Sequence, residues 1–319
     1  MHDDPARTLR CGDFPPRIIN SRSLAYGAGI DRHALTGILV MLLGYFMFSL
    51  NDAMGKWLVG GYSVAQVLLV RSVGAFLLIG PSLVRQPAGA LWQAERPRLQ
   101  WLRALMALGD TAMFYAAVVF LPLADVITFY MAGPIYMAAM AHLFLNERLS
   151  ARHWMAIALG FVGVVIALRP SSAAFSWTSL LALMGSVSFS GSLVLGRHLR
   201  HTPDPVLAGW QSMVAAAGGA ALLLGNQLFG DMIPGAWTTP GWRDLAAMLL
   251  LGAVACAANL LMTRALKALP ASTLAPLQYT LLLWAVVFGY VFFGDLPDLQ
   301  LIVGCAVIVI ASLLLLKRR

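Results

Sequence analysis

The chain has 319 residues, of which 60% are hydrophobic and only 11% are charged, and its mean hydropathy is +0.77. A soluble domain carries roughly 25% charged residues, so this composition excludes a soluble globular protein and places most of the chain in a lipid bilayer. The net charge of +8 does not indicate a nucleic-acid partner, because the basic residues fall in short loops, as they do in membrane proteins.

Residues 1–33 are polar, contain Pro15 and Pro16, and lack the apolar core of a secretory signal peptide. We expect them to form a disordered cytoplasmic segment at the N-terminus, or to be an upstream extension included by a misplaced start codon.

From residue 34 onward the hydropathy predicts ten transmembrane helices, because about 20 apolar residues are needed to cross the hydrocarbon core of a bilayer. The expected spans are residues 34–56, 63–82, 99–119, 124–145, 151–168, 176–196, 206–228, 243–265, 271–293 and 298–316.

The distribution of basic residues supports this number of spans. With the N-terminus placed in the cytoplasm, 18 of the 22 lysines and arginines fall on the cytoplasmic side, three fall outside, and Arg71 lies within a span. The positive-inside rule requires such an excess, and one span more or fewer would spoil it. The chain is therefore predicted to be a multi-pass protein of a bacterial inner membrane with both termini in the cytoplasm.

The second half of the chain repeats the first. Residues 121–125 (LPLAD) recur as residues 269–273 (LPAST) at an offset of 148, and Gly44 and Phe48 fall on Gly185 and Phe189 at an offset of 141. We therefore expect two five-helix repeats, at residues 34–169 and 176–316. An odd number of spans in each repeat inserts the two copies in opposite directions. The predicted fold is an all-α membrane protein with ten transmembrane helices, arranged as an inverted 5+5 repeat around a central cavity, which suits alternating access.

An ionisable side chain within a membrane span is costly and marks a functional hypothesis, and Asp52, Arg71 and Asp110 are the three best candidates of this kind. At about 1.5 Å per residue, Arg71 lies roughly 12 Å and Asp110 roughly 13 Å below the outer face, and Asp52 roughly 7 Å below it. Arg71 and Asp110 could therefore pair, either in a substrate site or as a static ion pair that fixes helix packing. Asp52 would then attract a cationic group or carry a coupling proton, unless it reaches the outer surface or caps a bent helix end.

Neutral polar and aromatic residues within the spans form a second set of candidates. Deep aromatic rings with amides between them suit a cavity for a flat or amphipathic organic solute, although ordinary interhelical packing explains many of them individually. These candidates are Tyr45, Asn51, Tyr115, Tyr130, Trp210, Gln211, Asn259, Gln278, Tyr279 and Trp284.

Two spans contain helix-breaking residues. Gly133 and Pro134 interrupt the fourth span, and Pro276 interrupts the ninth. Such breaks free backbone groups to line a cavity or let a helix bend, although a kink without function is an equally good interpretation.

Enzyme chemistry finds no support in the sequence, which has no phosphate loop, no HExxH and no nucleophile elbow. The three cysteines, Cys11, Cys256 and Cys305, form no CxxC pair, so we expect no disulfide framework, no metal site and no cofactor. Without an ATP-binding motif, any pumping must draw on a gradient or on exchange.

Several motifs in a fixed order make residues 34–316 resemble the drug/metabolite transporter superfamily, of the EamA type. The matching stretches are Arg71, residues 114–117 (FYAA), 121–124 (LPLA), 146–149 (NERL), 263–266 (TRAL), 276–279 (PLQY) and 293–295 (FGD). The resemblance implies ten helices in an inverted repeat with a central cavity, and secondary transport of a small-molecule solute.

The resemblance leaves the solute open among the family's amino acids, nucleosides, cofactors, polyamines and drugs. Amino acids or related metabolites rank first, with export, including that of aromatic amino acids, because they cover the largest share of the family. Residues 48–56 also look like members that import riboflavin or S-adenosylmethionine-like metabolites. An alternative of another class is a non-transporting membrane scaffold or lipid-handling protein. The expected partners are the solute, the lipid bilayer and a proton as candidate coupling ion, with no nucleic acid, in a monomer or homodimer.

Overall fold

A computed structural model describes residues 32–87, 89–92, 96–120, 123–168, 177–229, 237–293 and 299–316, and within these ranges it contains helices and turns but no β-strand. The predicted all-α class is therefore confirmed for the described part of the chain. Residues 1–31 of the expected disordered segment lie outside these ranges. The first helix already begins at Arg32, so the last two residues of that segment are helical rather than disordered.

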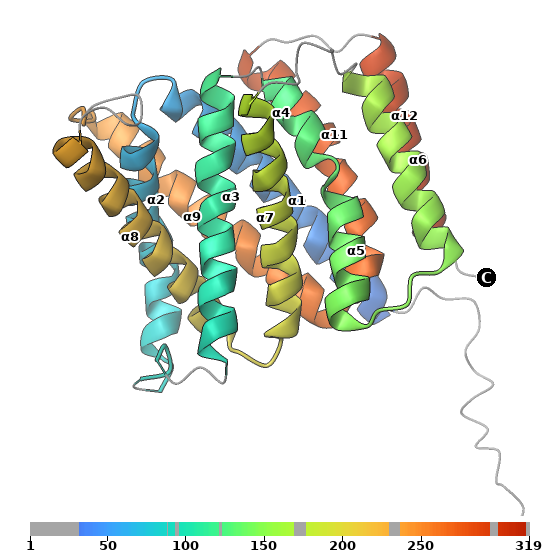
Figure 1. The fold of residues 1–319 in the computed structure, drawn as a ribbon, viewed down its shortest axis with the longest axis horizontal. Helices are drawn as coiled ribbons and strands as arrows, with labels where there is room; N and C mark the ends of the chain where they lie inside the picture. The colour runs from blue at the N-terminus through green and yellow to red at the C-terminus, as the bar shows by residue number, and fades with distance from the viewer. Residues whose placement is uncertain are drawn as a thin grey trace, which may run out of the picture.

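The helices follow one another as an up-and-down bundle (Figure 1). In chain order the elements are α1 (Arg32–Val59), α2 (Val64–Val84), α3 (Pro97–Phe120), α4 (Leu123–Tyr130), α5 (Gly133–Leu145), α6 (Ala151–Leu168), α7 (Trp177–His198), α8 (Asp204–Phe229), α9 (Trp242–Ala268), α10 (Ala271–Leu274), η3 (Ala275–Tyr279), α11 (Thr280–Phe288), η4 (Gly289–Phe293) and α12 (Leu299–Leu316).

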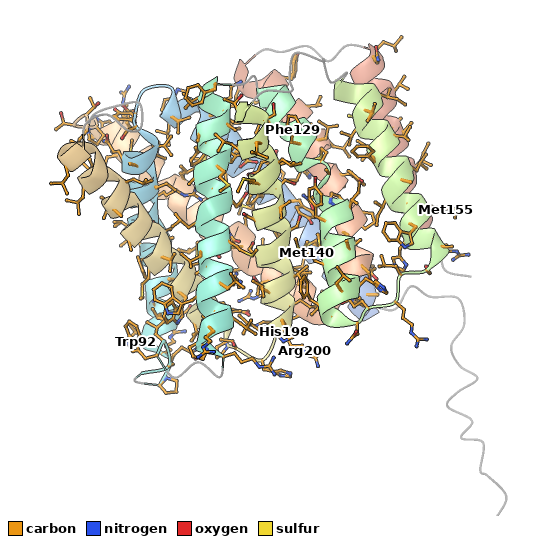
Figure 2. All side chains as sticks on the ribbon, viewed as in Figure 1. Trp92, Phe129, Met140, Met155, His198 and Arg200 are labelled. Carbon is orange, nitrogen blue, oxygen red and sulfur yellow. The ribbon has the colours of Figure 1, made fainter. Side chains whose placement is uncertain are left out.

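Seven helical stretches of the described chain are long and apolar enough to cross a membrane: residues 34–59, 64–84, 97–120, 178–198, 204–225, 242–268 and 271–292. Residues 133–145, 151–166 and 302–311 form shorter apolar helices. Large apolar side chains cover the outside of the bundle (Figure 2); Leu77, Leu143 and Leu299 are 66%, 70% and 77% exposed. A surface of this kind belongs against lipid tails.

Both spans with predicted helix breakers are interrupted in the structure. Between α4 and α5 the helix opens at Met131 and Ala132, and Pro134 follows at the start of α5, where its missing N–H is tolerated. Pro276 lies in η3, a five-residue 3-10 segment that separates α10 from α11. The interpretation that these residues break their helices is therefore confirmed.

Side chains from other helices bind the backbone carbonyls at the break between α4 and α5. Ser190 Oγ donates to Gly133 O at 3.1 Å, and Gln278 Nε2 and Ser186 Oγ donate to Tyr130 O at 3.3 and 3.5 Å. Backbone carbonyls without a hydrogen bond are energetically costly in a bilayer, so these donors from neighbouring helices stabilise the break.

Most of the packing joins helices that are distant in sequence: α1 lies against α9, α3 against α7, α2 against α8 and α9, and α6 against α12. Two glycines let α2 and α9 meet at backbone distance. A Cβ added to Gly74 would overlap the backbone of Leu249, and one added to Gly252 would overlap the carbonyl of Arg71. Small residues permit this close approach, which fixes the position of Arg71 inside the bundle.

Candidate functional site

Two adjoining cavities lie in the interior, one between α1, α2, α3, α4 and α7 and the other beside it toward α8 and α9. The central cavity has about 30 Å³ of free space and is lined by Phe48, Asn51, Asp52, Arg71, Ala107, Asp110, Thr111, Phe114, Tyr115, Tyr130, Phe189, Ser192, Gln211 and Asn259. The side cavity has about 50 Å³ and is lined by Leu68, Arg71, Ser72, Ala75, Ala107, Leu108, Thr111, Ala208, Gln211, Ser212, Ala215, Gly252, Ala255, Cys256 and Asn259. The two cavities lie side by side, because they share the lining residues Arg71, Ala107, Thr111, Gln211 and Asn259.

Arg71 forms hydrogen bonds with two other residues that line the central cavity. Its Nη1 donates to the Tyr115 hydroxyl at 3.0 Å, and its Nη2 donates to Asn51 Oδ1 at 3.3 Å. The amide of Asn51 in turn donates to Asp52 Oδ1 at 3.3 Å. A guanidinium has five N–H donors, so these two neutral partners leave Arg71 able to bind a further acceptor.

Asp110 faces the same cavity and is 6% exposed. The Tyr130 hydroxyl donates to its Oδ1 at 2.8 Å and also contacts its backbone oxygen at 3.2 Å. Tyr130 is the last residue of α4, so the carboxylate is joined directly to the helix break.

The predicted pairing of Arg71 with Asp110 is wrong for this structure. All three charged residues of the cavity are described, and no ion pair joins Arg71 to Asp52 or Asp110. Equal depth placed Arg71 and Asp110 at the same level, but Tyr115 and Asn51 occupy the guanidinium and Tyr130 occupies the carboxylate. Asp52 also lines the cavity.

Two other predicted residues connect the cavities. Gln211 accepts a hydrogen bond from Arg103 Nη2 at 3.2 Å, and Asn259 donates to Ala255 O at 3.0 Å. Both line the central and the side cavity. The structure thus brings together eight predicted residues: Asn51, Asp52, Arg71, Asp110, Tyr115, Tyr130, Gln211 and Asn259.

Five predicted residues do not line either cavity. Tyr45 is fully buried in the core, and its hydroxyl has no partner among the described residues. Trp210 donates to Leu91 O at 2.6 Å near one end of the bundle. Trp284 packs edge-on against Phe46, with ring centroids 4.9 Å apart.

The other two, Gln278 and Tyr279, support the helix interruptions. Gln278 bonds the carbonyl of Tyr130, and the Tyr279 hydroxyl donates to Ile157 O at 2.9 Å. These positions indicate structural roles in the described conformation.

The cavity is also lined by aromatic and hydroxyl residues that are not among the candidates predicted from the sequence: Phe48, Thr111, Phe114, Phe189 and Ser192. Phe48 and Phe189 carried a usable signal, because they occupy equivalent places in the two repeats. Their rings touch in the structure, with centroids 5.1 Å apart.

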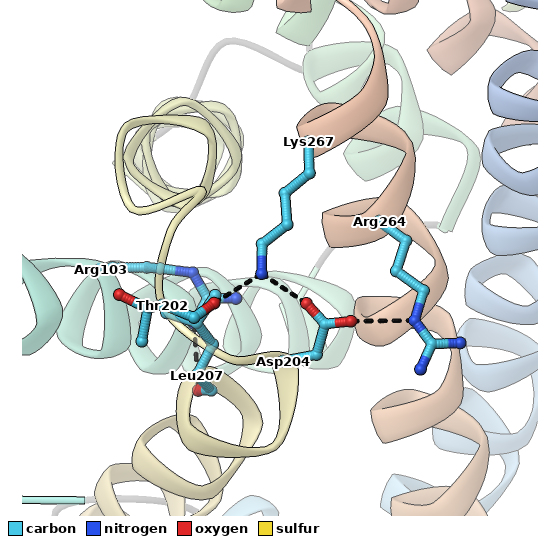
Figure 3. Close-up of polar contacts among 6 residues, drawn as sticks. All are labelled: Arg103, Thr202, Asp204, Leu207, Arg264 and Lys267. Atoms are coloured by element: carbon cyan, nitrogen blue, oxygen red, sulfur yellow. Dashed lines mark hydrogen bonds and ion pairs between the residues drawn. The ribbon is translucent and has the colours of Figure 1, made fainter. Parts of the chain in front are cut away.

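Ion pairs close the end of the bundle where α7 and α9 finish and α3 begins, which we call the basic end (Figures 1 and 2). Asp204 accepts from Lys267 Nζ at 2.5 Å and from Arg264 Nε at 2.9 Å, and Lys267 also donates to Thr202 O (Figure 3). These contacts tie the turn between α7 and α8 to the end of α9.

A second group at the basic end involves Glu147, whose carboxylate accepts from the backbone N–H groups of Ala271 and Ser272 at 3.1 and 2.9 Å. Arg197 lies 3.5 Å from the same carboxylate and donates to the carbonyl of Leu266. The loop after α5 is thus joined to α7, α9 and α10.

Polar contacts also join helices and loops at the opposite end of the bundle. Tyr62 donates to Asp244 Oδ2 at 2.6 Å, and this bond holds the pKa of the Tyr62 phenol above its ordinary value. The Gln66 amide exchanges two hydrogen bonds with the backbone of Thr238. Within the described ranges, no group of three histidine, cysteine or acidic residues is placed to hold a metal ion.

Comparisons with known proteins agree with this architecture. The family model described as the EamA-like transporter family matches residues 35–169 and, separately, residues 176–317. The chain is 28% identical to a riboflavin transporter of Rhizobium johnstonii, over 89% of this chain and 92% of the relative. It is 24% identical to an S-adenosylmethionine uptake transporter of Rickettsia prowazekii, over 88% and 92% of the two chains.

A pseudopaline exporter of Pseudomonas aeruginosa is 26% identical, over 89% of this chain and 97% of the relative. A protein crystal structure superposes with a TM-score of 0.69 at 20% sequence identity, over 89% of this chain and 96% of the other, and shows the same fold. The relatives are named as transporters, and they come from bacteria.

Proposed function

Because the chain belongs to the EamA-like transporter family, we propose that it is a secondary transporter of small organic metabolites that carry an α-amino-acid group, with amino acids first among them. It is a multi-pass membrane protein related to bacterial transporters. We place it in the inner membrane with both termini in the cytoplasm, since the basic end carries most of the loop arginines and lysines.

The observation that carries the proposed solute is the charge arrangement of the central cavity. Arg71 bonds only neutral groups among the described residues, so its guanidinium is available for a solute carboxylate. Asp52 and Asp110 line the same space and provide acceptors for a solute ammonium group. The rings of Phe48, Phe114 and Phe189 supply flat apolar walls for a side chain.

An importer of a cofactor-type metabolite is the second candidate, and the names of the relatives favour it. S-adenosylmethionine carries an α-amino-acid group and would use the same three charges. Riboflavin is uncharged at neutral pH, so it would use the aromatic walls and leave the arginine and carboxylates without a charged partner. The relatives include uptake transporters and an exporter, so the direction of transport must be measured.

The proposed mechanism is alternating access between inverted repeats at residues 34–169 and 176–316. Two separate matches to one family model support the duplication. α1 and α7 are the first spans of the two proposed repeats, and α3 and α9 are the third spans. A twofold relation between the repeats therefore predicts that α1 packs against α9 and that α7 packs against α3, and both contacts are present. Phe48 touches its counterpart Phe189, as expected of residues near a twofold axis. Each half also has one interrupted span, the fourth in the first half and the ninth in the second, with the breaks at nearby but not identical positions of the repeat.

The described conformation is a closed one in this mechanism. Free spaces of about 30 and 50 Å³ accommodate a few water molecules, whereas ligand pockets usually have roughly 300 Å³ or more. Opening at either end would have to separate helices to admit a solute. We propose that protonation of Asp110 or Asp52 shifts the equilibrium between the closed and open conformations, because each carboxylate lines the central cavity.

The test is flux into proteoliposomes containing purified protein, with L-phenylalanine, L-phenylalaninamide, S-adenosylmethionine and riboflavin as labelled probes, with and without a pH gradient. Saturable flux of a probe with an α-amino-acid group, lost in Arg71→Met, supports the proposal. Flux of riboflavin alone favours the second candidate. No flux of these probes or of a broad metabolite panel favours a non-transporting scaffold or lipid-handling protein.

A further inference from the structure

A second buried arginine lies between the central cavity and the basic end. Arg103 in α3 is only 5% exposed. Its Nη1 donates to Leu207 O and its Nη2 to Gln211 Oε1, each at 3.2 Å, while its Nε has no partner. No acidic residue of the described chain forms an ion pair with it.

A guanidinium buried with only neutral partners is energetically expensive, and inside a membrane protein it marks a place for an anion. Asp204, the acid drawn with Arg103 in Figure 3, is already bound by Lys267 and Arg264. Asp204 therefore does not neutralise the charge of Arg103, and the guanidinium remains available to another anion.

Gln100 provides a second unsatisfied group beside it. The side chain is 1% exposed, and neither Nε2 nor Oε1 has a hydrogen-bond partner. Residues three apart on a helix share a face, so Gln100 and Arg103 are neighbours on α3. Arg103 Nε and Gln100 Nε2 are two free donors, the number that the two oxygens of a carboxylate require.

Gln211 connects this pair to the central cavity, because it lines both cavities and accepts from Arg103. α3 begins at the basic end, and Arg103 precedes Asp110 by seven residues, or about 10 Å of helix. Arg103 and Gln100 therefore lie between the central cavity and the basic end of the bundle.

We infer that Arg103 and Gln100 form a second carboxylate subsite, which binds the solute's carboxylate group after it leaves Arg71 on the way to or from the basic end. This inference rests on the proposed transport function and adds a second binding position for the carboxylate of the same solute. In the described conformation Gln211 Oε1 occupies Arg103 Nη2, which leaves Arg103 Nε and Gln100 Nε2 as the two donors for the solute carboxylate.

The first experiment measures half-saturation for L-phenylalanine and L-phenylalaninamide separately at each face, in right-side-out and inside-out vesicles. In Arg103→Gln we expect the half-saturation constant for L-phenylalanine at the basic-end face to rise about tenfold or more, the loss typical of one charge-assisted hydrogen bond. Arg103→Lys should recover part of it. The matched control is Arg98→Gln, an exposed arginine of the same helix. Equal effects of Arg103→Gln on the acid and the amide, or no effect on either, overturn the inference.

The second experiment supplies an internal acid next to Arg103. Gln100→Glu should raise the melting temperature in detergent and slow the flux of L-phenylalanine severalfold, because its carboxylate competes for the subsite. Gln100→Met, which adds no charge, should do neither. Unchanged melting and flux in Gln100→Glu would contradict a vacant carboxylate subsite. This readout remains available even where Arg103→Gln fails to fold.

The outcomes separate this inference from the proposed function. Flux of riboflavin or L-phenylalaninamide alone leaves the transporter in place and refutes the carboxylate subsite. Absence of flux for every probe refutes both the proposed transport function and the carboxylate subsite. A resident inorganic anion is tested by replacing chloride with methanesulfonate. If the effect of Arg103→Gln vanishes without chloride, the subsite holds chloride and the inference fails.

Discussion

Replacing Gly252 by alanine tests whether the backbone contact between α2 and α9 positions Arg71. A Cβ at this position would overlap the carbonyl oxygen of Arg71, which belongs to the backbone and cannot rotate away. Overpacking an interior costs typically about 1–3 kcal/mol, and a rigid neighbour places this site at the upper end. Alanine is favoured over glycine within a helix by about 1 kcal/mol, so the expected net loss is about 2 kcal/mol.

The matched control is Gly225→Ala in α8, where an added Cβ meets no described atom within 4 Å. This variant should gain about 0.5–1 kcal/mol from helix propensity alone. Thermal melting in detergent should therefore shift downward for Gly252→Ala and slightly upward for Gly225→Ala. Because the displaced backbone carries Arg71, Gly252→Ala should also raise the half-saturation constant for L-phenylalanine. A Gly252→Ala protein that melts like the wild type and transports with an unchanged constant would refute the reasoning.

Three further substitutions address the cavity, the basic end and a predicted residue outside the cavity. Asp110→Asn should abolish uptake driven by a pH gradient yet spare solute exchange, measured in proteoliposomes; loss of folded protein in detergent would instead assign the carboxylate a structural role. Asp204→Ala removes the acid shared by Lys267 and Arg264. Labelling of the basic end by a water-soluble reagent should therefore increase. Unchanged labelling would show that other contacts close the basic end. Tyr279→Phe removes the bond to Ile157 O at a cost of about 1 kcal/mol, and it should lower the melting temperature without changing half-saturation; a changed half-saturation constant would return Tyr279 to the solute site.

Hydropathy and helix breakers were sufficient to predict the class and the interruptions of the fold, because they act locally. An apolar run long enough to cross a bilayer must be helical, and Pro134 and Pro276 cannot donate the backbone bond that a continuous helix needs. The inverted relation of the two repeats was inferred from charge bias and an odd number of spans, and it remains a proposal supported by the pairing of the helices.

The side-chain contacts of the site were harder to predict, because depth along a helix does not fix rotation about its axis. Arg71 and Asp110 were placed at one level, yet each bonds a tyrosine instead of the other. Trp210 and Trp284 have the size and polarity of cavity residues, but Trp210 bonds Leu91 in the turn between α2 and α3, and Trp284 packs against Phe46 of α1. Arg103 is one of the 18 basic residues assigned to the cytoplasmic side by the positive-inside rule, but it is buried inside the bundle.

The seam between α4 and α5 takes its donors from the opposite half of the chain. Ser186 and Ser190 belong to α7, and Gln278 belongs to η3. Sliding one half past the other would strip two carbonyl oxygens of these donors in a nonpolar medium, unless solvent replaced them. In the proposed alternating-access mechanism, hydration of the interior and movement of the halves would therefore be thermodynamically linked. The dry bundle would resist the movement, and water entering with a solute would hydrate the two carbonyls and permit it.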